Sequence, residues 1–289
     1  MSIGVCITTR HRPDTLEQCL EHLRKSTQPP SSVVVSDDSS KPEMQSATAA
    51  VVAKFPEAVL VSGPRKGVCA NRNNAFAHLG AADYVSFLDD DALVSPTYFE
   101  VAQSTYDAMS PERRERAILT GVRIDAFAPR VETMCRLDFL CYFTASEKPE
   151  VAGASYAVYP RSFFLRHPWD ERIYFGLEDA ELSLRAKKAG YEIIYVKDMI
   201  LRDVGQGKST FVIEKPGERV SEYAFNGEAA RLYVGVKRYK DIEENYAKLA
   251  LFVPLFFAQN IWSLAKRRSL HRMPELVRLS NVTSLLRGN

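Results

Sequence analysis

Short apolar runs alternate with helical patterns along the first third of the chain. The apolar runs predict strands at residues 3–8, 32–36, 59–62 and 84–88. The segments between them predict helices at residues 13–26, 45–55 and 67–79. This alternation is typical of an α/β fold with a central, mostly parallel sheet and right-handed crossovers. In such a Rossmann-like domain, ligands bind at the carboxyl edge of the strands.

Three consecutive carboxylates, Asp89, Asp90 and Asp91, follow the predicted strand at residues 84–88. Like charges repel, so their concentration at the end of a strand indicates that a cation sits between them. Carboxylate oxygens favour Mg²⁺ or Mn²⁺. We therefore expect a divalent ion that holds a phosphate.

Polar clusters also follow the other predicted strands, at residues 8–13, 37–40 and 67–74. Each alone could be a turn, a helix cap or, for Arg72, a surface arginine. Their repetition at successive strand ends favours a pocket instead. Carboxylate, hydroxyl and guanidinium groups together suit a nucleoside and its phosphates.

Composition sets the class of the protein. With 289 residues and 46% hydrophobic content, the chain can bury a full core and is expected to fold alone. Its five cysteines show no CxxC spacing, and an apolar strand pattern begins at Ile3 in place of a signal peptide. We expect reduced thiols and a cytoplasmic location.

The net charge of +2 is unevenly distributed. Residues 230–289 carry eleven Lys or Arg and four Asp or Glu, so the body is mildly acidic and the C-terminal part is basic. No recognised nucleic-acid-binding module accompanies the basic part, so we expect no nucleic-acid partner.

The polar clusters together resemble family 2 glycosyltransferases of the GT-A fold. Thr9-Arg10-His11-Arg12-Pro13 is similar to their opening Thr-Tyr-Asn-Arg-Pro segment, and residues 33–40 resemble their second strand with its Asp-Asp-x-Ser ending. Residues 67–73 resemble their Gly-x-x-x-Ala-Arg-Asn element, with Asn71 where alanine is usual, and residues 87–91 fall at their DxD position. Further similarity, at residues 153–161, 169–171, 174–179 and 181–195, extends the resemblance to about residue 203.

The resemblance implies a single GT-A domain at residues 1–228, followed by a helical extension at residues 229–289. Residues 1–100 would bind the nucleotide and residues 101–228 the acceptor. The nucleotide-binding residues that it implies are Thr9, Arg10, Arg12, Asp37, Asp38, Arg72, Asp89 and Asp90.

For the metal, we expect direct ligation by Asp91, with Asp89 and Asp90 contacting the ribose or metal-bound water and Asp89 as a possible further ligand. The family commonly supplies a histidine ligand after the strand at residues 193–196, but this chain has Leu201-Arg202-Asp203 there. Asp203 could replace the histidine, or Arg202 could pair with the diphosphate. The five histidines show no metal-ligand spacing.

For catalysis, the resemblance implies that Asp179 is the general base and that Glu178 helps to orient the acceptor. A base must lie within hydrogen-bonding reach of the acceptor hydroxyl. The alternative is that these acidic residues only favour the start of a helix, as they also do.

The C-terminal part contains an apolar run at residues 249–258, then Ile261-Trp262 and Lys266-Arg267-Arg268. The ten-residue run is shorter than the roughly 20 residues that span a bilayer. We predict a helical segment at residues 249–272 that lies on a membrane surface, with its cations toward anionic lipid. The competing interpretation is a helix packed on the catalytic domain or in a homodimer interface.

The resemblance therefore implies an inverting, metal-assisted hexosyltransferase that uses a nucleotide-diphosphate sugar, with UDP preferred and dTDP second. A saccharide or lipid-linked saccharide would be the acceptor, in surface polysaccharide or glycolipid assembly at the inner face of the membrane. The alternatives are a catalytically inactive nucleotide-sugar-binding or scaffold protein, and a nucleotidyltransferase.

Overall fold

The N-terminal elements of the computed structural model follow the predicted order. The structure describes residues 1–127, 131–132, 134–205, 212, 215 and 217–286. The first elements are β1 (Ile3–Thr9), α1 (Pro13–Arg24), β2 (Ser32–Asp37), α2 (Pro42–Val52), β3 (Ala58–Ser62), α3 (Val68–Ala77) and β4 (Tyr84–Asp89). The predicted strands and helices are confirmed. The second helix begins earlier than predicted because Pro42 occupies its first turn, where its fixed φ is favourable.

The central sheet is parallel in its first half and mixed in its second. Its order is β3-β2-β1-β4-β10-β6-β11-β5, with β7 paired to β6. β10 runs antiparallel to both neighbours, whereas β11 is parallel to β6 and antiparallel to β5. These later strands are β5 (Ala92–Val94), β6 (Ala117–Asp125), β7 (Val131–Glu132), β10 (Ala157–Pro160) and β11 (Glu192–Asp203). A separate hairpin pairs β8 (Cys135–Leu137) with β9 (Phe143–Ala145).

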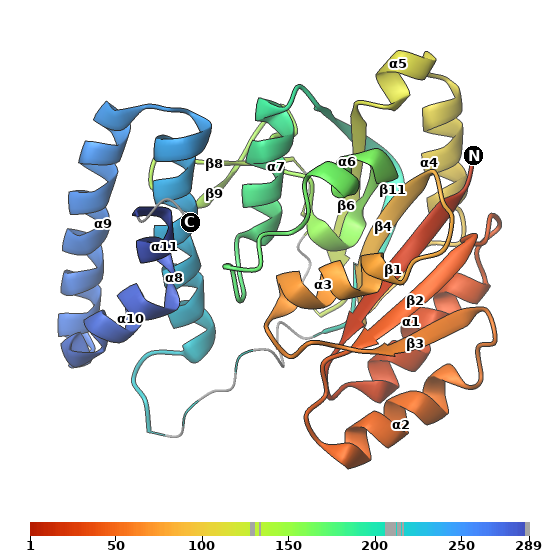
Figure 1. Cartoon of the computed structure of the whole chain (residues 1–289), viewed down its shortest axis with the longest axis horizontal. Helices are drawn as coiled ribbons and strands as arrows, with labels where there is room; N and C mark the ends of the chain where they lie inside the picture. Colours follow the sequence, from red (N-terminus) through yellow and green to blue (C-terminus); the bar gives the residue numbers. More distant parts are fainter. Residues whose placement is uncertain (128–130, 133, 206–211, 213–214, 216, 287–289) are drawn as a thin grey trace.

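Helices cover both faces of the sheet (Figure 1). The alternation of side chains in β1 shows the division: Val5 and Ile7 join one apolar cluster, and Cys6 joins the other. The first cluster includes side chains of α1 and α4 (Tyr98–Asp107). The second includes side chains of α3, α6 (Arg161–Arg166) and α7 (Glu178–Lys188). The short elements α5 (Pro111–Arg114) and η1 (Ala154–Tyr156) complete this part of the chain.

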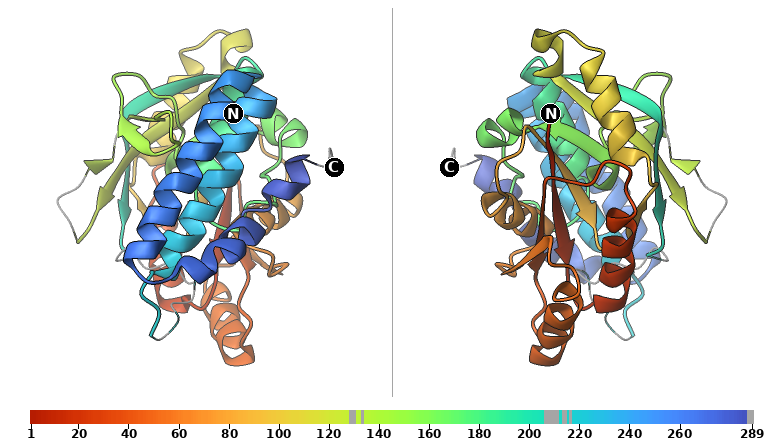
Figure 2. Two further views of the ribbon diagram at one scale, coloured as in Figure 1. Left: turned by 90° about the vertical axis from the view of Figure 1, so that its left-hand side faces the viewer. Right: turned by 90° about the vertical axis from the view of Figure 1, so that its right-hand side faces the viewer.

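The C-terminal part is helical, as predicted, and packs on the α7 side of the molecule (Figures 1 and 2). Its elements are α8 (Glu222–Lys237), η2 (Arg238–Ile242), α9 (Tyr246–Lys266), η3 (Leu270–Arg272), α10 (Met273–Leu279) and α11 (Val282–Leu286). The predicted boundary at residues 228/229 falls inside α8, so the helical part begins at Glu222. Ala229, Ala230 and Tyr233 of α8 are buried in the same cluster as Trp169.

The helix α9 is longer than the ten-residue apolar run suggested. It has 21 residues, because the helix begins at an Asn245 cap and continues through Gln259 and Asn260. Within the described part of the chain, α9 is the one helix whose length and apolar composition would suffice to cross a membrane. The expectation that the segment is too short to span a bilayer was therefore wrong with respect to the length of α9.

The five cysteines, all within the described residues, form no disulfide.

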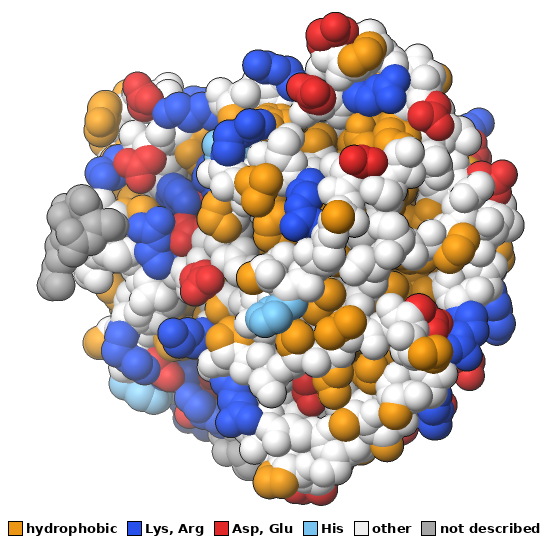
Figure 3. Space-filling view, turned by 45° about the vertical axis from the view of Figure 1, so that its right-hand side comes forward, with side chains coloured by type: hydrophobic (Ala, Val, Ile, Leu, Met, Phe, Trp, Pro, Cys, Tyr) orange, Lys and Arg blue, Asp and Glu red, His pale blue; other side chains and the backbone are white. Residues whose placement is uncertain are grey.

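Figure 3 shows the molecule turned so that the right-hand side of Figure 1, where the sheet lies, comes forward. On this face, Lys and Arg are interspersed with Asp, Glu and apolar patches. This face therefore shows no continuous field of one sign.

Candidate active site

The register of the parallel strands brings the predicted polar clusters to one edge of the sheet. Thr9 at the end of β1 pairs with Asp37 of β2, and Thr8 pairs with Asp89 of β4. The loops that follow these strands are therefore neighbours. As expected, this is the carboxyl edge, where α/β sheets bind ligands.

The three consecutive carboxylates have different surroundings. The Asp90 side chain is 0% exposed, accepts a hydrogen bond from Thr9 Oγ1 at 2.7 Å, and pairs with Arg12. Burial, and then repulsion by Asp91, raise its pKa above the ordinary value, although Arg12 opposes this. Thr9 is also 0% exposed. Both side chains are buried and hold Arg12 at the end of β4. Their contact with the nucleotide stays a prediction.

Asp89 faces the surface. Its side chain is 33% exposed, with Oδ2 accepting from Ser155 Oγ at 2.7 Å and Oδ1 from Arg72 at 3.0 Å. Burial alone would raise the pKa of Asp89, but Arg72 and Ser155 hold it below its ordinary value. Both oxygens of Asp89 therefore already accept a hydrogen bond, and the roles of Asp89 as a metal ligand or ribose contact stay predictions.

Arg72 links the two halves of the edge. It is buried, donates to Glu178 Oε1 at 2.9 Å as well as to Asp89, and its guanidinium lies 4.8 Å from the Trp169 ring centroid. Burial would lower its pKa, but Asp89 and Glu178 raise it, so it stays charged. The alternative that Arg72 is a surface arginine is therefore wrong.

The carboxylates of Asp91 and Asp203 lie close together over Gly205. A Cβ placed on Gly205 would lie 2.0 Å from Asp91 Oδ2 and 3.1 Å from Asp203 Oδ1. The register that pairs Asp203 with Ala92, and a hydrogen bond from Val204 N to Asp91 O at 3.0 Å, bring the two acids together. Burial, and then Asp89 and Asp203, raise the pKa of Asp91, whereas Arg12 lowers it.

This pair fits a divalent ion that is completed by phosphate oxygens. Mg²⁺ is typically held by one or two carboxylates plus substrate phosphates. Among the described residues, no group of three or more His, Cys, Asp or Glu could hold a metal by itself. Arg12 donates to Asp91 at 2.6 Å and Arg123 donates to Asp203 at 2.8 Å, so both acids are also held by arginines.

Arg202 does not share the position of Asp203. It is exposed, and successive side chains of a strand point to opposite faces. Arg202 therefore points away from the face on which Asp203 meets Asp91. The alternative in which Arg202 pairs with the diphosphate is not supported.

The loop after β2 has the geometry of a tight turn. Asp37 Oδ1 accepts from Ser39 N at 2.8 Å, and Asp38 Oδ1 accepts from Arg65 N at 2.8 Å. Burial raises the pKa of Asp38, although the Arg65 hydrogen bond opposes this. A Cβ on Gly63 would lie 2.2 Å from Asp38 Oδ1, so the glycine permits the close approach. The roles of Asp37 and Asp38 in nucleotide binding stay predictions.

The start of α7 forms the other side of the site. Leu177 adopts a left-handed conformation before the helix, and Glu178 and Asp179 occupy its first turn. The Glu178 side chain is 13% exposed and paired with Arg72, whereas Asp179 is half-buried and accepts from Ala180 N at 2.7 Å. The structure thus brings both predicted catalytic acids to the same edge as Asp89.

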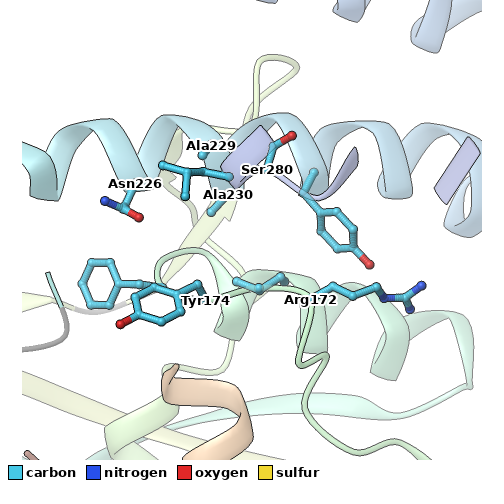
Figure 4. Close-up of a pocket in the computed structure, with 10 residues that line it drawn as sticks. Arg172, Tyr174, Asn226, Ala229, Ala230 and Ser280 are labelled. Carbon is cyan, nitrogen blue, oxygen red and sulfur yellow. The ribbon is translucent and has the colours of Figure 1, made fainter. Parts of the chain in front are cut away.

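The segment before α7 closes on the glycine loop. Tyr174 O accepts from Val68 N at 3.0 Å, and a Cβ on Gly67 would lie 2.6 Å from Tyr174 O. Arg10 donates to the Tyr174 hydroxyl at 3.4 Å. Behind this segment, toward α8, lies a cavity of about 10 Å³ lined by Arg172, Tyr174, Asn226 and Ser280 among others (Figure 4). That volume suits one water and excludes a nucleotide sugar.

Two participants were missed as site residues. Ser155 lies within residues 153–161, which the sequence related to the family without a site role, and Arg123 belongs to none of the predicted clusters. Arg123 lies 80 residues from Asp203 in the sequence, and only the pairing of β6 with β11 brings them together. No local pattern could have indicated that contact.

Comparison with known proteins adds the family to this geometry. Residues 4–110 match the family model described as glycosyl transferase family 2. Residues 4–110 are therefore similar in sequence to family 2 glycosyltransferases. No curated protein matches the sequence significantly.

Solved structures of this glycosyltransferase fold cover nearly the whole chain. S. aureus TarS 1-349 in complex with UDP-GlcNAc matches with a TM-score of 0.61 and 18% identity over 96% of this chain and 79% of that one. GalNAc-T7 with UDP, GalNAc and Mn²⁺ matches with a TM-score of 0.60 and 15% identity, over 93% of this chain and 58% of that one. The chain spans 43% of the longer S. aureus TarS chain, with a TM-score of 0.58 and 17% identity over 88% of its own length. These likenesses show the GT-A fold.

Proposed function

We propose that this protein is a family 2 glycosyltransferase that moves a sugar from a nucleotide-diphosphate donor to an acceptor hydroxyl, with inversion and with the aid of Mg²⁺ or Mn²⁺. The observation that carries the proposal is the bridge by Arg72 between Asp89 at the end of β4 and Glu178 at the start of α7. It joins the donor side and the acceptor side at one edge of the sheet. A purely structural acidic cluster would not require this arrangement.

The donor side suits a nucleoside diphosphate. In this proposal Asp38 and Arg10 would border the nucleoside, and Arg12, which pairs with Asp91, would lie at the phosphate end. S. aureus TarS 1-349 was solved with UDP and with UDP-GlcNAc, and GalNAc-T7 with UDP. We therefore keep UDP as the preferred carrier and dTDP as the second.

Asp91 and Asp203 are the residues that would hold the divalent ion. The ion, when bound, neutralises charge that develops on the leaving diphosphate. Arg12 holds Asp91 through Oδ2, and Arg123 holds Asp203 through Oδ2. Such outer partners orient ligating carboxylates.

Asp179 would receive the proton in the transfer step. The acceptor oxygen bonds to the anomeric carbon as the bond from that carbon to the phosphate oxygen breaks, and the proton passes to Asp179. The nucleoside diphosphate leaves with the bonding electrons. Glu178 is held by Arg72, so its role is to keep Arg72 and the start of α7 in place beside the acceptor.

The acceptor is proposed to be a saccharide or a lipid-linked saccharide, in surface polysaccharide or glycolipid assembly in the cytoplasm or at its membrane. This part of the proposal rests on the apolar surface of α9 and is separable from the donor chemistry. Two alternatives keep the same fold: an inactive nucleotide-sugar-binding protein and a nucleotidyltransferase.

A panel of UDP-, dTDP- and GDP-sugars tests the proposal. Binding is measured by calorimetry with Mn²⁺, with Mg²⁺ and with chelator, and turnover is measured as released nucleoside diphosphate. Asp91→Ala should weaken metal-dependent binding at least about tenfold. Asp198→Ala, an exposed acid on β11, is the matched control and should bind as wild type.

Each alternative has its own outcome in this panel. Binding without turnover of any donor would favour the inactive protein. Preference for a nucleoside triphosphate, with release of pyrophosphate, would favour the nucleotidyltransferase.

A further inference from the structure

One face of α9 packs against the protein. Phe252, Phe256, Asn260 and Leu264, spaced four residues apart, are buried. The ring of Phe252 lies directly on Gly235 of α8, where a Cβ would come within 2.1 Å of the ring. This face is therefore buried, with Phe252 packed on α8.

Polar contacts fix α9 on α8. Asn260 donates to Glu228 Oε2 at 3.0 Å, and Arg231 donates to Gln259 Oε1 at 3.2 Å. The Arg231 guanidinium also lies 4.5 Å from the Phe256 ring centroid. If α9 crossed a bilayer, these partly buried polar groups would lose their partners, which is costly. The helix is thus held as part of the folded body, although its length would suffice to span.

The opposite face of α9 is apolar and exposed. Leu251, Leu255 and Trp262 are 60%, 48% and 62% exposed. The remaining exposed apolar residues of this face are Ala247, Ala250, Pro254, Ala258, Ile261 and Ala265. In the view from the α9 side, the helix lies along the outside of the molecule (left panel of Figure 2). Contiguous apolar surface of this kind marks an interaction site.

Positive charge borders this apolar face. Lys266, Arg267 and Arg268 follow at its C-terminal end, and Lys266 Nζ lies 3.6 Å from the Trp262 ring centroid. The sequence contains no Asp or Glu from residue 246 to residue 272. An amphipathic helix with such cations and a tryptophan matches an anionic lipid surface.

We propose that α9 lies in the plane of an anionic membrane surface. Leu251, Leu255 and Trp262 enter the interface, and Lys266 and Arg267 contact the headgroup phosphates. The membrane-facing surface is shorter than the predicted segment of residues 249–272. Its C-terminal residue, Arg272, is excluded because it is buried and pairs with Glu222 at 2.7 Å. This inference goes beyond the proposed transfer reaction and does not depend on it.

A second copy of the chain is the less favourable occupant of this face. A two-fold interface places the same patch on both subunits. Two copies would pair this face with itself, and residues 246–272 offer no Asp or Glu to meet Lys266 and Arg267. Charge complementarity therefore favours the anionic lipid.

Tryptophan fluorescence of the full-length protein can report the contact. The chain has two tryptophans, of which Trp169 is 1% exposed and Trp262 is 62% exposed. Vesicles of phosphatidylcholine with phosphatidylglycerol are compared with vesicles of phosphatidylcholine alone, by emission and by co-sedimentation. We expect a blue shift and binding with the anionic vesicles, and at least about tenfold weaker binding to the neutral ones.

Two double variants separate the apolar and charged contributions. Leu251→Gln/Leu255→Gln should weaken binding at least about tenfold, since apolar area no longer leaves water. Its control is Val59→Gln/Leu165→Gln, at apolar residues that are exposed elsewhere. Lys266→Ala/Arg267→Ala should weaken binding about 30-fold, whereas Lys25→Ala/Lys148→Ala should leave it unchanged.

The inference is overturned if anionic vesicles neither bind the protein nor shift its emission. It is also overturned if the α9 variants bind as wild type. Concentration-dependent dimerisation in light scattering, lost in Leu251→Gln/Leu255→Gln and seen without vesicle binding, would assign the face to a second copy. Failure of the sugar transfer assay would leave these readouts unaffected.

Discussion

Arg72 and Glu178 are 106 residues apart in the sequence and form an ion pair at 2.9 Å that joins the start of α3 to the start of α7. Because the same guanidinium reaches Asp89, the end of β4 and the start of α7 share one buried cation. A planar fork can hold two carboxylates at once, whereas an ammonium acts as a point charge. The bridge therefore depends on arginine specifically.

Arg72→Lys should lower kcat/KM for sugar transfer about 100-fold, because lysine cannot keep both contacts. Steady-state kinetics measure the effect, and circular dichroism checks the fold. Arg113→Lys, in an exposed pair with Glu192, is the control and should keep the wild-type rate. A rate for Arg72→Lys within about twofold of wild type would contradict the bridging role.

Asp203→Asn should weaken Mn²⁺ binding in the presence of UDP about tenfold, because one of the two carboxylates over Gly205 loses its charge. Calorimetry or electron paramagnetic resonance measures the bound ion. Asp198→Asn removes an exposed acid from the same strand and should have no effect. Equal affinities of the two variants would mean that Asp203 does not replace the usual histidine.

Gly63→Ala should weaken UDP binding at least about tenfold while the protein remains folded. The added Cβ would lie 2.2 Å from Asp38 Oδ1 and 2.6 Å from Asn71 Oδ1, so the loop after β2 must shift. Gly227→Ala in α8 meets nothing within 4 Å and is the matched control. If UDP affinity survives in Gly63→Ala, the loop after β2 does not shape the nucleoside site.

Asp170 supplies a pH-dependent part of the stability. Burial alone would raise its pKa, but Arg172, Lys237 and Tyr233 donate to its carboxylate and hold the pKa well below the ordinary value. The contribution of Asp170 to the free energy of unfolding is therefore fully present above the unfolded-state pKa of about 3.9. It declines as the pH falls toward the pKa of the folded state.

Asp170→Asn should lower the free energy of unfolding near neutral pH by about 3 kcal/mol, because Lys237 loses a buried partner. Between about pH 5 and pH 3 the variant should lose less stability than wild type. Urea unfolding at several pH values measures both. Glu192→Gln, in an exposed pair, should cost under about 1 kcal/mol, and an equal cost for Asp170→Asn would contradict the account.

Local sequence patterns were sufficient to predict the parallel half of the sheet. The apolar run at residues 32–36, for example, is buried on both faces of the sheet and lies between α1 and α2 in the sequence. The later strand was predicted only at residues 193–196, whereas β11 extends from Glu192 to Asp203. Its irregular register between Tyr195 and Ile200, and the polar Lys197 and Asp198, concealed the continuation.

The site was predicted as a set of residues, but not as a set of contacts. β4 ends at Asp89, so strand alternation did not predict that Asp90, in the turn that follows, is buried and shares Arg12 with Asp91. The partners of Asp203 and Asp89 come from Arg123 and Ser155, which are distant in sequence. Such contacts depend on the sheet topology, which no local pattern encodes.

The assignment of Asp179 as general base is tested most directly by Asp179→Asn, with the nucleotide sugar that the panel identifies. Calorimetry should show donor binding within about twofold of wild type, since the proposal places Asp179 beside the acceptor and not the donor. Release of nucleoside diphosphate should fall about a thousandfold, whereas Glu147→Gln, at an exposed acid, should keep the wild-type rate. Full transfer by Asp179→Asn with unchanged donor binding would contradict the mechanism.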